Sequence, residues 1–433
     1  MLLINKFNST ILMISKCFLD SIHGNIPICK YALQIIHTPE FQRLKKIKQL
    51  GNVHHVYMGA VHTRFEHSIG VSYLCGELIT NLRSNQKELN ITDRDITLIK
   101  IAGLCHDIGH GCFSHVFDNH FLKLKLRGTS KEKYIDHEYR SECIVRHIIK
   151  KYDFDYTDEE VDIICEYISP KERTKKPKYM YQIVANIDSG LDCDKIDYLI
   201  RDPKSTGNII SFNYKLLLER ARVIDNDICF PYDDAIDIQQ MFSARYYMHK
   251  KVYQHPTIKA LDHMITTMLC DLDSRLHISD NIDNIDAFCE CTDSIIDIDA
   301  YMHKNTITCD LRDQINLRDI YKVIYKTTTV DTIMNERLML HTANDNISNV
   351  IIDIATINYN SKTSNPLSRI CFYNRKSNID VKFKTNDHEI IVPTTFSESM
   401  MLIIFKKPDN ELQTKILKFI CDYAIIKQNS FIC

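Results

Sequence analysis

Residues 102–115 read AGLCHDIGHGCFSH, and this stretch decides the fold because it sets His106, Asp107, His110 and His115 directly behind an apolar run. The run LIKIAGLC has helical spacing, and the two glycines that follow are expected to end the helix. The adjacent His106 and Asp107 can then converge on one point beyond the helix end. A lone histidine is more often a hydrogen-bonded core or surface group, but a cluster of this size favours a metal or catalytic site.

The composition is that of a globular protein without a general attraction for polyanions. Hydrophobic residues make up 44% and charged residues 25% of the 433 residues, enough for two domains or one large one. The formal net charge is -2, so any site for a phosphorylated ligand must gather its cations locally.

The cysteines and the lack of a long apolar run predict a soluble protein of a reducing compartment, cytoplasmic or nuclear. The 16 cysteines include no CxxC pair, in a chain far larger than disulfide-stapled domains. Cys289 and Cys291 are close in sequence but lack partners for zinc, and we expect inert thiols there. No segment approaches the roughly 18 apolar residues that a membrane span requires.

Apolar residues recur at helical spacing from about residue 28 to 275, which predicts a helical globule. Two segments interrupt it. GNVHHVYMGAVHT (51–63) is rich in β-forming residues and predicts a short hairpin. SPKERTKKPK (169–178) predicts a solvated basic loop, with a nucleic-acid contact as the sharper but less favoured alternative.

The pattern becomes strand-like after about residue 314. The strand candidates are NVIIDIATINYN (349–360), RICFYNRK (369–376), IDVKFKT (379–385) and HEIIVPTTF (388–396), and the helix NELQTKILKFICDYAIIK (410–427) follows them. We therefore expect a helical domain over residues 1–313 and a smaller α+β lobe over residues 314–433.

Two further residues complete a mixed nitrogen and oxygen ligand set with His106 and Asp107. RFEHS supplies His67 upstream, and GLDCDKIDY supplies Asp194 downstream. Two imidazoles and two carboxylates suit iron, manganese or zinc, with coordination positions left for water and substrate. An HD pair alone is weak evidence in a long chain, whereas the spaced set of four is much stronger.

These motifs, together with DHE (136–138) and ARYYMHKKVYQH (244–255), resemble the HD-domain phosphohydrolases. Within them the chain is most similar to the sterile-alpha-motif-and-HD-domain deoxynucleoside triphosphate triphosphohydrolase family, from SIHGNI near residue 21 to INYNSKTSNPLSRICFY in the C-terminal lobe. The sterile-alpha-motif domain has no counterpart. The resemblance implies a mainly α fold, an HD-domain helical globule with a smaller C-terminal α+β lobe. It also implies an enzyme that cleaves a dNTP to the deoxynucleoside and inorganic triphosphate.

The resemblance implies that His67, His106, Asp107 and Asp194 hold the metal, which would activate water for attack on the α-phosphorus. Mg or Mn would accompany the substrate triphosphate. His115 would protonate the leaving 5′-oxygen, and Asp118 would hold its imidazole in the donating tautomer. The implied catalytic residues are His110, His115, Asp118, His137 and Glu138.

The resemblance also implies the groups that bind the substrate. Arg64, Lys195 and Arg245 would meet the triphosphate charge, with Tyr198 and His249 as further donors. On the sugar side the implied residues are Asp202 and Gln49 at the 3′-hydroxyl, Tyr253 against C2′, where it would exclude ribose, and Leu50 and Gln254 as lining of the pocket.

Several neighbouring residues have plainer explanations. Asp192, Asp197 and Glu66 flank the ligand candidates, and we expect them to make supporting hydrogen bonds or helix caps. His54, His55 and His62 lie in the predicted hairpin and are expected to be surface or turn residues.

Two other functions stay open. The first is a nuclease or cyclic-nucleotide phosphodiesterase that uses the same metal. This alternative is disfavoured by residues that suit a mononucleotide with a free 3′-hydroxyl, namely Lys195, Tyr198, Asp202 and the YQH at 253–255. The second is a catalytically silent protein that binds a nucleotide or nucleic acid.

The chain departs from the family at the positions implied for guanine-nucleotide effectors. Lys16 and Gln42 are kept, but His37 stands where the guanine-reading acid is implied and Lys45 where an arginine is implied. At the second effector site the residues are Leu19, Leu216, Pro231 and Asp233, none of them cationic. We expect no activation by GTP, and a monomer or homodimer in place of a nucleotide-bridged tetramer.

Overall fold

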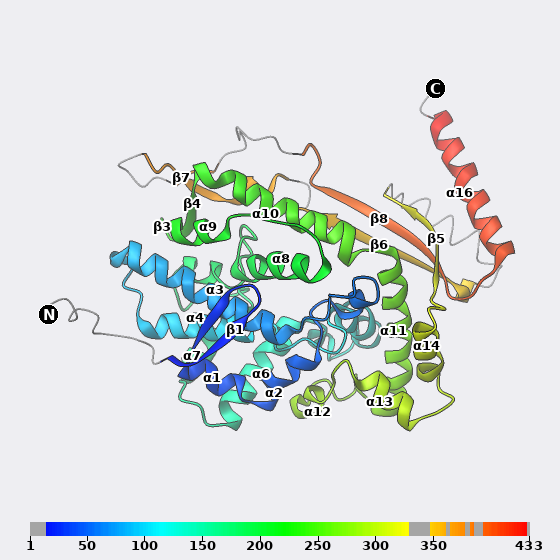
Figure 1. The fold of residues 1–433 in the computed structure, drawn as a ribbon, viewed down its shortest axis with the longest axis horizontal. Coiled ribbons are helices and arrows are strands. Elements are labelled where there is room, and N and C mark those ends of the chain that lie inside the picture. Colours follow the sequence, from blue (N-terminus) through cyan, green and yellow to red (C-terminus); the bar gives the residue numbers. More distant parts are fainter. Residues whose placement is uncertain (1–13, 329–346, 361–363, 377–381, 385–392, 431–433) are drawn as a thin grey trace.

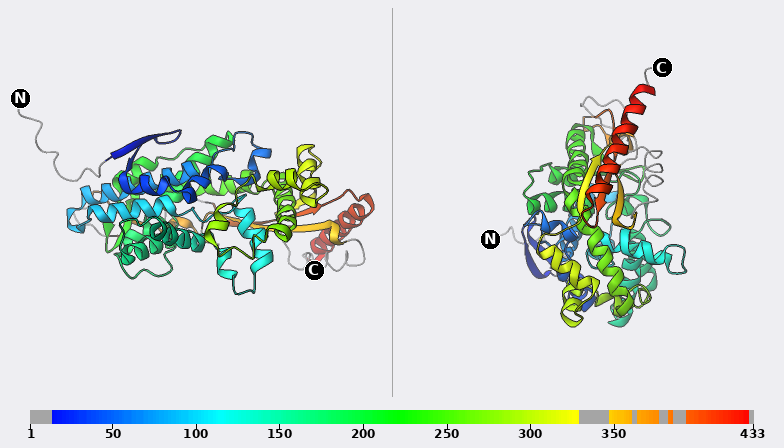
Figure 2. Two further views of the ribbon diagram at one scale, coloured as in Figure 1. Left: turned by 90° about the horizontal axis from the view of Figure 1, so that it is seen from below. Right: turned by 90° about the vertical axis from the view of Figure 1, so that its right-hand side faces the viewer.

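The computed structural model describes residues 14–328, 347–360, 364–376, 382–384 and 393–430. The first strands, β1 (Ile14–Asp20) and β2 (Gly24–Cys29), form an antiparallel hairpin that the sequence analysis did not predict. It lies against the first helices at the surface (Figures 1 and 2). Among the described residues, no helix is both long and apolar enough to cross a lipid bilayer.

The helical part follows the hairpin and confirms the predicted fold class. Its helices are α1 (Lys30–Ile36), α2 (Pro39–Gln42), α3 (Arg64–Asn85), α4 (Asp93–Cys105), α5 (Lys123–Leu126), α6 (His137–Lys151), α7 (Asp158–Ile168), α8 (Cys193–Thr206), α9 (Tyr214–Arg220), α10 (Ala235–Met248), α11 (Pro256–Leu276), α12 (Ile285–Cys289), α13 (Ile295–Met302) and α14 (Ile307–Asn316).

Short helical turns join these helices. The 3-10 turns are η1 (Arg43–Lys46), η2 (Gly51–His55), η3 (Lys87–Leu89), η5 (Glu132–Ile135), η6 (Lys178–Gln182), η7 (Tyr232–Asp234), η9 (Ile347–Asn349) and η10 (Pro366–Arg369), and the π-helical turns are η4 (Phe117–Leu122) and η8 (His249–Tyr253).

The hairpin predicted over residues 51–63 is wrong. Its first part is the 3-10 turn η2, and a single antiparallel bridge between Lys48 and Thr63 holds the ends of the segment together. Gly51 and Val53 are buried, so tertiary packing overrides the local preference for strand. The segment thereby becomes part of a cavity wall, as described below.

The C-terminal strands lie along one side of the helical part (Figure 1). β5 (Lys322–Thr327), β8 (Ser397–Phe405) and β6 (Val350–Asn358) form an antiparallel sheet with β8 in the middle. β7 (Cys371–Tyr373) pairs in parallel with β4 (Asp227–Pro231), which pairs with β3 (Arg222–Ile224). Because β4 belongs to the helical part, the C-terminal chain is hydrogen-bonded into it.

Strand β8 separates two cores by the alternation of its side chains. Met400, Leu402 and Ile404 face the main core formed with the helical part, whereas Met401, Ile403 and Phe405 belong to a smaller core with α16 (Asn410–Ser430). This helix stands out from the body of the molecule in the right-hand view of Figure 2.

The predicted C-terminal elements agree in part with the structure. NVIIDIATINYN contains β6, RICFYNRK contains β7, and the closing helix is α16. Residues 388–392 of HEIIVPTTF, and 379–381 and 385 of IDVKFKT, lie outside the described residues. β5 and the central β8 were not predicted. The division at residues 313 and 314 falls within α14 and stays a prediction.

Candidate metal and nucleotide site

Helix α4 ends where the HD pair begins. A capping box formed by Thr92 and Asp95 starts the helix, and its apolar side chains are fully buried. His106 is the C-cap residue, and Asp107 follows in a hydrogen-bonded turn. The buried helix therefore holds both side chains at a fixed place in the core, as the sequence predicted.

Helices α3 and α8 bring the other two predicted ligands to the same point. His67 lies in the first turn of α3, and Asp194 in the first turn of α8. The two helices meet closely at Gly70, where an added Cβ would lie 2.1 Å from Asp197 Oδ1 and 2.5 Å from Arg201 Nη2. A glycine is required there because any side chain would push the two helices apart.

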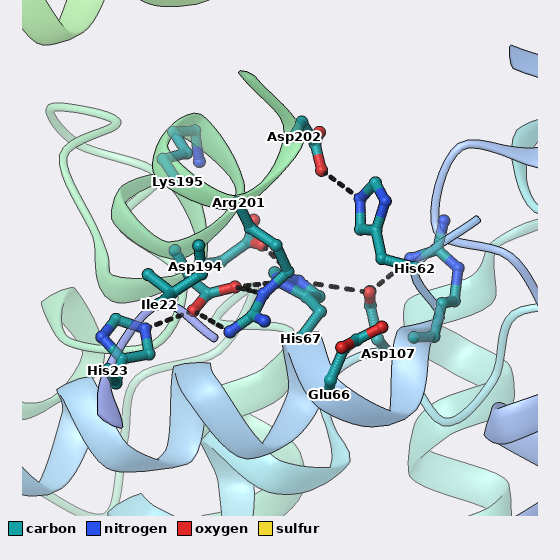
Figure 3. Close-up of polar contacts among 12 residues, drawn as sticks. Ile22, His23, His62, Glu66, His67, Asp107, Asp194, Lys195, Arg201 and Asp202 are labelled. Carbon is teal, nitrogen blue, oxygen red and sulfur yellow. Dashed lines mark hydrogen bonds and ion pairs between the residues drawn. The ribbon is translucent and has the colours of Figure 1, made fainter. Parts of the chain in front are cut away.

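His67, His106 and Asp194 converge closely enough to hold one metal ion, and Asp107 lies beside the two histidines. His67 Nε2 lies 3.2 Å from Asp194 Oδ1 and 3.5 Å from Asp107 Oδ2. His106 Nε2 lies 3.5 Å from Asp194 Oδ1 and 3.4 Å from Asp107 Oδ1. Figure 3 shows His67 with Asp107 on one side and Asp194 on the other.

Both histidines present an unpaired ring nitrogen to this point. His67 Nδ1 bonds Asp197 Oδ2 at 2.7 Å, and His106 Nδ1 bonds the Gly103 carbonyl at 2.8 Å. The Nε2 atoms of both rings are buried and have no hydrogen-bond partner. A ring whose Nδ1–H is donated to an acceptor leaves Nε2 as a lone pair, which is how metal-binding histidines are oriented. The residues present therefore fit a divalent transition metal.

The electrostatics of the set agree with a cation at its centre. Burial raises the pKa of Asp194, but His106 and His67 outweigh it and hold that pKa well below the usual value. Burial lowers the pKa of His67, and the carboxylates of Asp194 and Asp197 more than offset it, raising the pKa to about 10. Metal binding requires a neutral imidazole, so a bound cation would displace any proton that these carboxylates retain on His67.

Helix α6 brings His137 beside the HD turn. An added Cβ on Gly109 would lie 2.2 Å from the His137 carbonyl oxygen, so a side chain there would push α6 away. Ser141 donates to the His106 carbonyl at 2.7 Å, and Arg140 Nε donates to the Gly109 carbonyl at 2.8 Å. These buried bonds place His137 against His110, with ring centroids 3.9 Å apart.

Asp118 lies beside His115, its predicted partner, and also beside His110 and His137. Its Oδ2 lies 3.4 Å from His110 Nδ1 and 3.3 Å from His137 Nδ1, and its Oδ1 accepts a bond from Arg140. His115 contacts this group through its ring, 5.1 Å from the ring of His110. Ring nitrogens of His110 and His115 and a carboxylate oxygen of Asp118 lie within 4.8 Å of one another, so the predicted support of His115 by Asp118 stays a prediction.

His115 opens onto a cavity of about 460 Å³ that joins the predicted substrate residues. Burial, followed by the charges of His110, Arg64 and His137, holds the pKa of His115 well below its ordinary value. Predicted site residues that line the cavity are Gln49, Leu50, Arg64, Asp107, His110, His115, His137, Asp194, Tyr198, Asp202, Arg245, His249, Tyr253 and Gln254.

The remaining predicted residues are not among those that line the cavity. His67, His106 and Asp118 contact lining residues, as described above. Lys195 Nζ bonds Asp192 Oδ2 at 2.8 Å, and Glu138 Oε2 accepts a bond of 3.0 Å from Ser169. The Glu138 bond therefore connects α6 to the chain that follows α7.

The cations Arg64 and Arg245 and the polar rings of Tyr198 and His249 line the cavity together with Asp107 and Asp194. Arg64 is buried and donates to Asp107, and Arg245 Nη1 donates to Asn358 Oδ1 of β6 at 3.1 Å. Burial, then Arg245, lowers the pKa of His249 to about 3. Burial raises the pKa of Tyr198 to about 12, which keeps the hydroxyl as a donor.

Asp202 and Tyr253, two residues implied for the sugar side, form a hydrogen-bonded group with His62. Tyr253 OH donates to Asp202 Oδ2 at 2.6 Å, and His62 Nε2 lies 2.8 Å from Asp202 Oδ1. The prediction that His62 is a surface or turn residue is wrong in this respect, because its side chain is buried against Asp202. His54 and His55 are half-buried around η2.

Several polar residues that line the cavity were not singled out from the sequence. They are Asn52 of η2, Asn119 and His120 of η4, and Lys259 and Asp262 of α11. Asn52 Nδ2 donates to Asp262 Oδ1 at 3.3 Å. The only sequence feature that could have indicated them is the three-residue spacing of Lys259 and Asp262 in α11. The same spacing is found on the solvent-exposed face of an ordinary helix.

The supporting roles expected for three acidic residues are confirmed. Asp197 bonds His67, Asp192 caps α8 by accepting from the Lys195 backbone N–H, and Glu66 completes a capping box with Thr63.

The cations of the basic loop are bound to acidic neighbours. Lys171 pairs with Asp136 at 2.9 Å, and Lys176 pairs with Asp95 at 2.7 Å. Arg173 and Lys175 pair with Asp188 and Asp162. Charges neutralised in this way offer less to a nucleic acid than free cations would.

The fold and the site define a class of protein, the HD-domain hydrolases. A family model described as HD domain matches residues 64–202, which contain all four predicted metal ligands. Deoxynucleoside triphosphate triphosphohydrolase SAMHD1 of Bos taurus is 33% identical over 95% of this chain and 78% of its own length. The SAMHD1 homolog of Dictyostelium discoideum is 31% identical, over 96% and 83%. SAMHD1 of Homo sapiens is 31% identical, over 92% and 71%.

The chain therefore belongs to the SAMHD1 family of deoxynucleoside triphosphate triphosphohydrolases. This confirms the family resemblance of the motifs.

Proposed function

We propose that the protein is a metal-dependent hydrolase that cleaves a dNTP to the deoxynucleoside and inorganic triphosphate. The observation that carries the proposal is the pair of unpaired, buried Nε2 atoms of His67 and His106, which face two carboxylates beside a cavity lined with cations. The names of the relatives agree with this reaction.

His67, His106, Asp107 and Asp194 would hold iron, manganese or zinc. Once bound, the metal supplies Lewis-acid activation of water for attack on the α-phosphorus. The chain contributes the orientation of the ligands: Asp197 and the Gly103 carbonyl hold the rings, and Arg64 holds the Asp107 carboxylate. Such supporting bonds keep the ligand atoms in place before the metal arrives.

Arg64, Arg245 and Lys195 would meet the triphosphate, which Mg or Mn would accompany. A triphosphate carries about four negative charges, and guanidinium groups bind phosphate oxygens by paired hydrogen bonds. Tyr198 and neutral His249 are further donors on the same wall. Because Arg245 is already held by Asn358 of the C-terminal lobe, this lobe contributes to the placement of a phosphate-binding group.

His115 would protonate the leaving 5′-oxygen. Its lowered pKa favours the neutral ring in the free protein. The negative charge of a bound triphosphate would offset the positive charges of His110, Arg64 and His137. The pKa of His115 would then rise toward the range of an effective acid. His115 would therefore become a proton donor when substrate is present.

Tyr253 and Asp202 would select deoxyribose. The ring of Tyr253 is held by its bond to Asp202, and Tyr253 and Gln49 both line the cavity. In the proposed complex Asp202 and Gln49 bind the 3′-hydroxyl, and the ring faces C2′ without room for a 2′-hydroxyl.

We further propose that the enzyme works without GTP and as a monomer or homodimer. At the implied effector positions the Gln42 amide donates to the Ile36 carbonyl at 2.6 Å, and Lys45 lies over the ring of Phe65 at 4.6 Å. Leu19 is 85% exposed and cannot bind a phosphate. These contacts support the proposal because they occupy or replace the groups that an effector nucleotide would use.

Identification of the phosphate product tests the reaction. The protein is incubated with each dNTP and NTP plus Mn²⁺ or Mg²⁺, and the products are separated by ion-exchange chromatography. Inorganic triphosphate from dNTPs alone is the expected result. Release of monophosphate from a polynucleotide or cyclic nucleotide would favour a nuclease or phosphodiesterase. Binding without turnover in the metal-loaded protein would favour a catalytically silent protein.

A further inference from the structure

His62 is a buried histidine that bonds Asp202 and Gln49, the two residues proposed above to bind the 3′-hydroxyl, so a role for it in recognition rests on the proposed function. Asp202 bonds two partners, one for each carboxylate oxygen: Tyr253 OH at 2.6 Å on Oδ2 and His62 Nε2 at 2.8 Å on Oδ1 (Figure 3 shows the His62 bond). The side chains of His62 and Asp202 are 7% and 2% exposed. The carboxylate is therefore fixed in rotation and keeps further lone pairs for a third donor.

His62 also contacts Gln49, the other residue proposed to bind the 3′-hydroxyl. The Gln49 backbone N–H donates to the His62 carbonyl at 3.0 Å, beside the bridge between Lys48 and Thr63. Gln49 Oε1 is buried without a hydrogen-bond partner and belongs to a side chain that lines the cavity. One residue thus joins the backbone of Gln49 to the side chain of Asp202.

We propose that His62 is the positioning residue for recognition of the 3′-hydroxyl. His62 lies behind Asp202 and outside the residues that line the cavity, so it acts through Asp202 without contact to the nucleotide. Its imidazole holds the Asp202 carboxylate at the angle at which Gln49 and Asp202 can bind one hydroxyl between them. Loss of the imidazole leaves the backbone bond to Gln49 intact and frees only Asp202.

This division predicts an effect that depends on the substrate. His62→Ala is expected to lower kcat/KM for dTTP roughly ten-fold, the usual effect of losing one hydrogen bond to a charged group. The kcat/KM for 2′,3′-dideoxy-TTP, which lacks the 3′-hydroxyl, is expected to change less than about two-fold by the same reasoning. His62→Gln, whose amide can also donate to Asp202, is expected to recover part of the preference.

The measurement is the ratio of kcat/KM for dTTP to that for dideoxy-TTP in the wild type, His62→Ala and His62→Gln. The matched control is His55→Ala, in the same segment, whose ring rests on His54 at 4.2 Å and lies outside the cavity wall. The control is expected to keep the wild-type ratio. Equal loss of both substrates in His62→Ala, or an unchanged ratio, would overturn the inference.

The same ratio is read from binding, which separates this inference from the proposed reaction. Calorimetry with dTTP and dideoxy-TTP on chelator-treated protein in Ca²⁺ gives their dissociation constants. If the wild type released no triphosphate, the proposed reaction would fail, and the binding ratio in His62→Ala would still decide the role of His62. If His62→Ala does not fold, the binding ratio in His62→Gln decides the role of His62. Equal weakening of dTTP and dideoxy-TTP in that variant would contradict a role through Asp202.

Discussion

Replacing Asp197 by asparagine tests whether metal affinity depends on the carboxylate behind His67. Asp197 Oδ2 accepts from His67 Nδ1 at 2.7 Å, and Oδ1 accepts from His23 Nε2 at 2.6 Å. Asparagine has nearly the same volume, so the substitution removes charge and one acceptor without opening a cavity. Loss of such a supporting bond weakens metal binding by roughly 10- to 100-fold, or about 1.4–2.7 kcal/mol.

The same substitution is expected to destabilise the fold. Arg201, almost fully buried, bonds Asp197 at 2.8 Å and Asp20 at 2.9 Å. Removing one partner of a buried ion pair costs about 3–5 kcal/mol, and we expect the lower end because Asp20 continues to neutralise the guanidinium. The variant should therefore remain folded with a lower Tm.

The assay is metal content after dialysis against a graded series of chelator concentrations, measured by mass spectrometry of the metal. Asp162→Asn is the control, because Asp162 pairs with Lys175 and Arg146 at the surface, far from the ligands in the chain. Metal retention by Asp197→Asn equal to that of the wild type would refute the proposed orientation of His67, whatever the change in Tm.

Three further variants and one addition test the remaining parts of the site. His106→Ala combined with Asp107→Ala should abolish metal content and hydrolysis together, and wild-type turnover would contradict the metal assignment. His115→Ala should retain metal and nucleotide but lose roughly 10²- to 10⁴-fold in rate, whereas loss of metal would make it a ligand. Tyr253→Ala should admit ribonucleotides, seen as NTP hydrolysis, and an unaltered dNTP preference would place the discrimination elsewhere. GTP should change neither the rate nor the mass measured by light scattering, and a large rise in both would overturn the effector proposal.

Helical spacing predicted most of the helices because a buried helix repeats its apolar residues along one face. The same criterion failed at β8. Its sequence SESMMLIIF has no polar alternation, since one face packs on the helical part and the other on α16. The segment at 51–63 failed in the opposite way. Its β-forming residues suggested a hairpin, but Gly51 approaches the Phe113 carbonyl so closely that an added Cβ would lie 2.9 Å away, and the chain turns as η2.

The candidate ligands could be predicted because each belongs to a short motif with distinctive chemistry. The order of histidine and aspartate along the chain, with the glycines that end a buried helix, was sufficient to propose His67, His106, Asp107 and Asp194 as ligands. The partners of these residues could not be selected in this way. A carboxylate that orients a ligand looks the same in sequence as one that caps a helix, and Asp192 and Asp197 do one each.

The sequence by itself determined the class of fold, the family and the residue types available for a metal and a phosphorylated ligand, since these depend on local periodicity and on motifs of a few residues. Tertiary structure alone decided which side chains meet. His62 bonds Asp202 from 140 positions away, and Arg245 bonds Asn358 from 113 positions away. Hydrogen bonds of this kind form only when separate elements pack together, and no local pattern in the chain records their distance or direction.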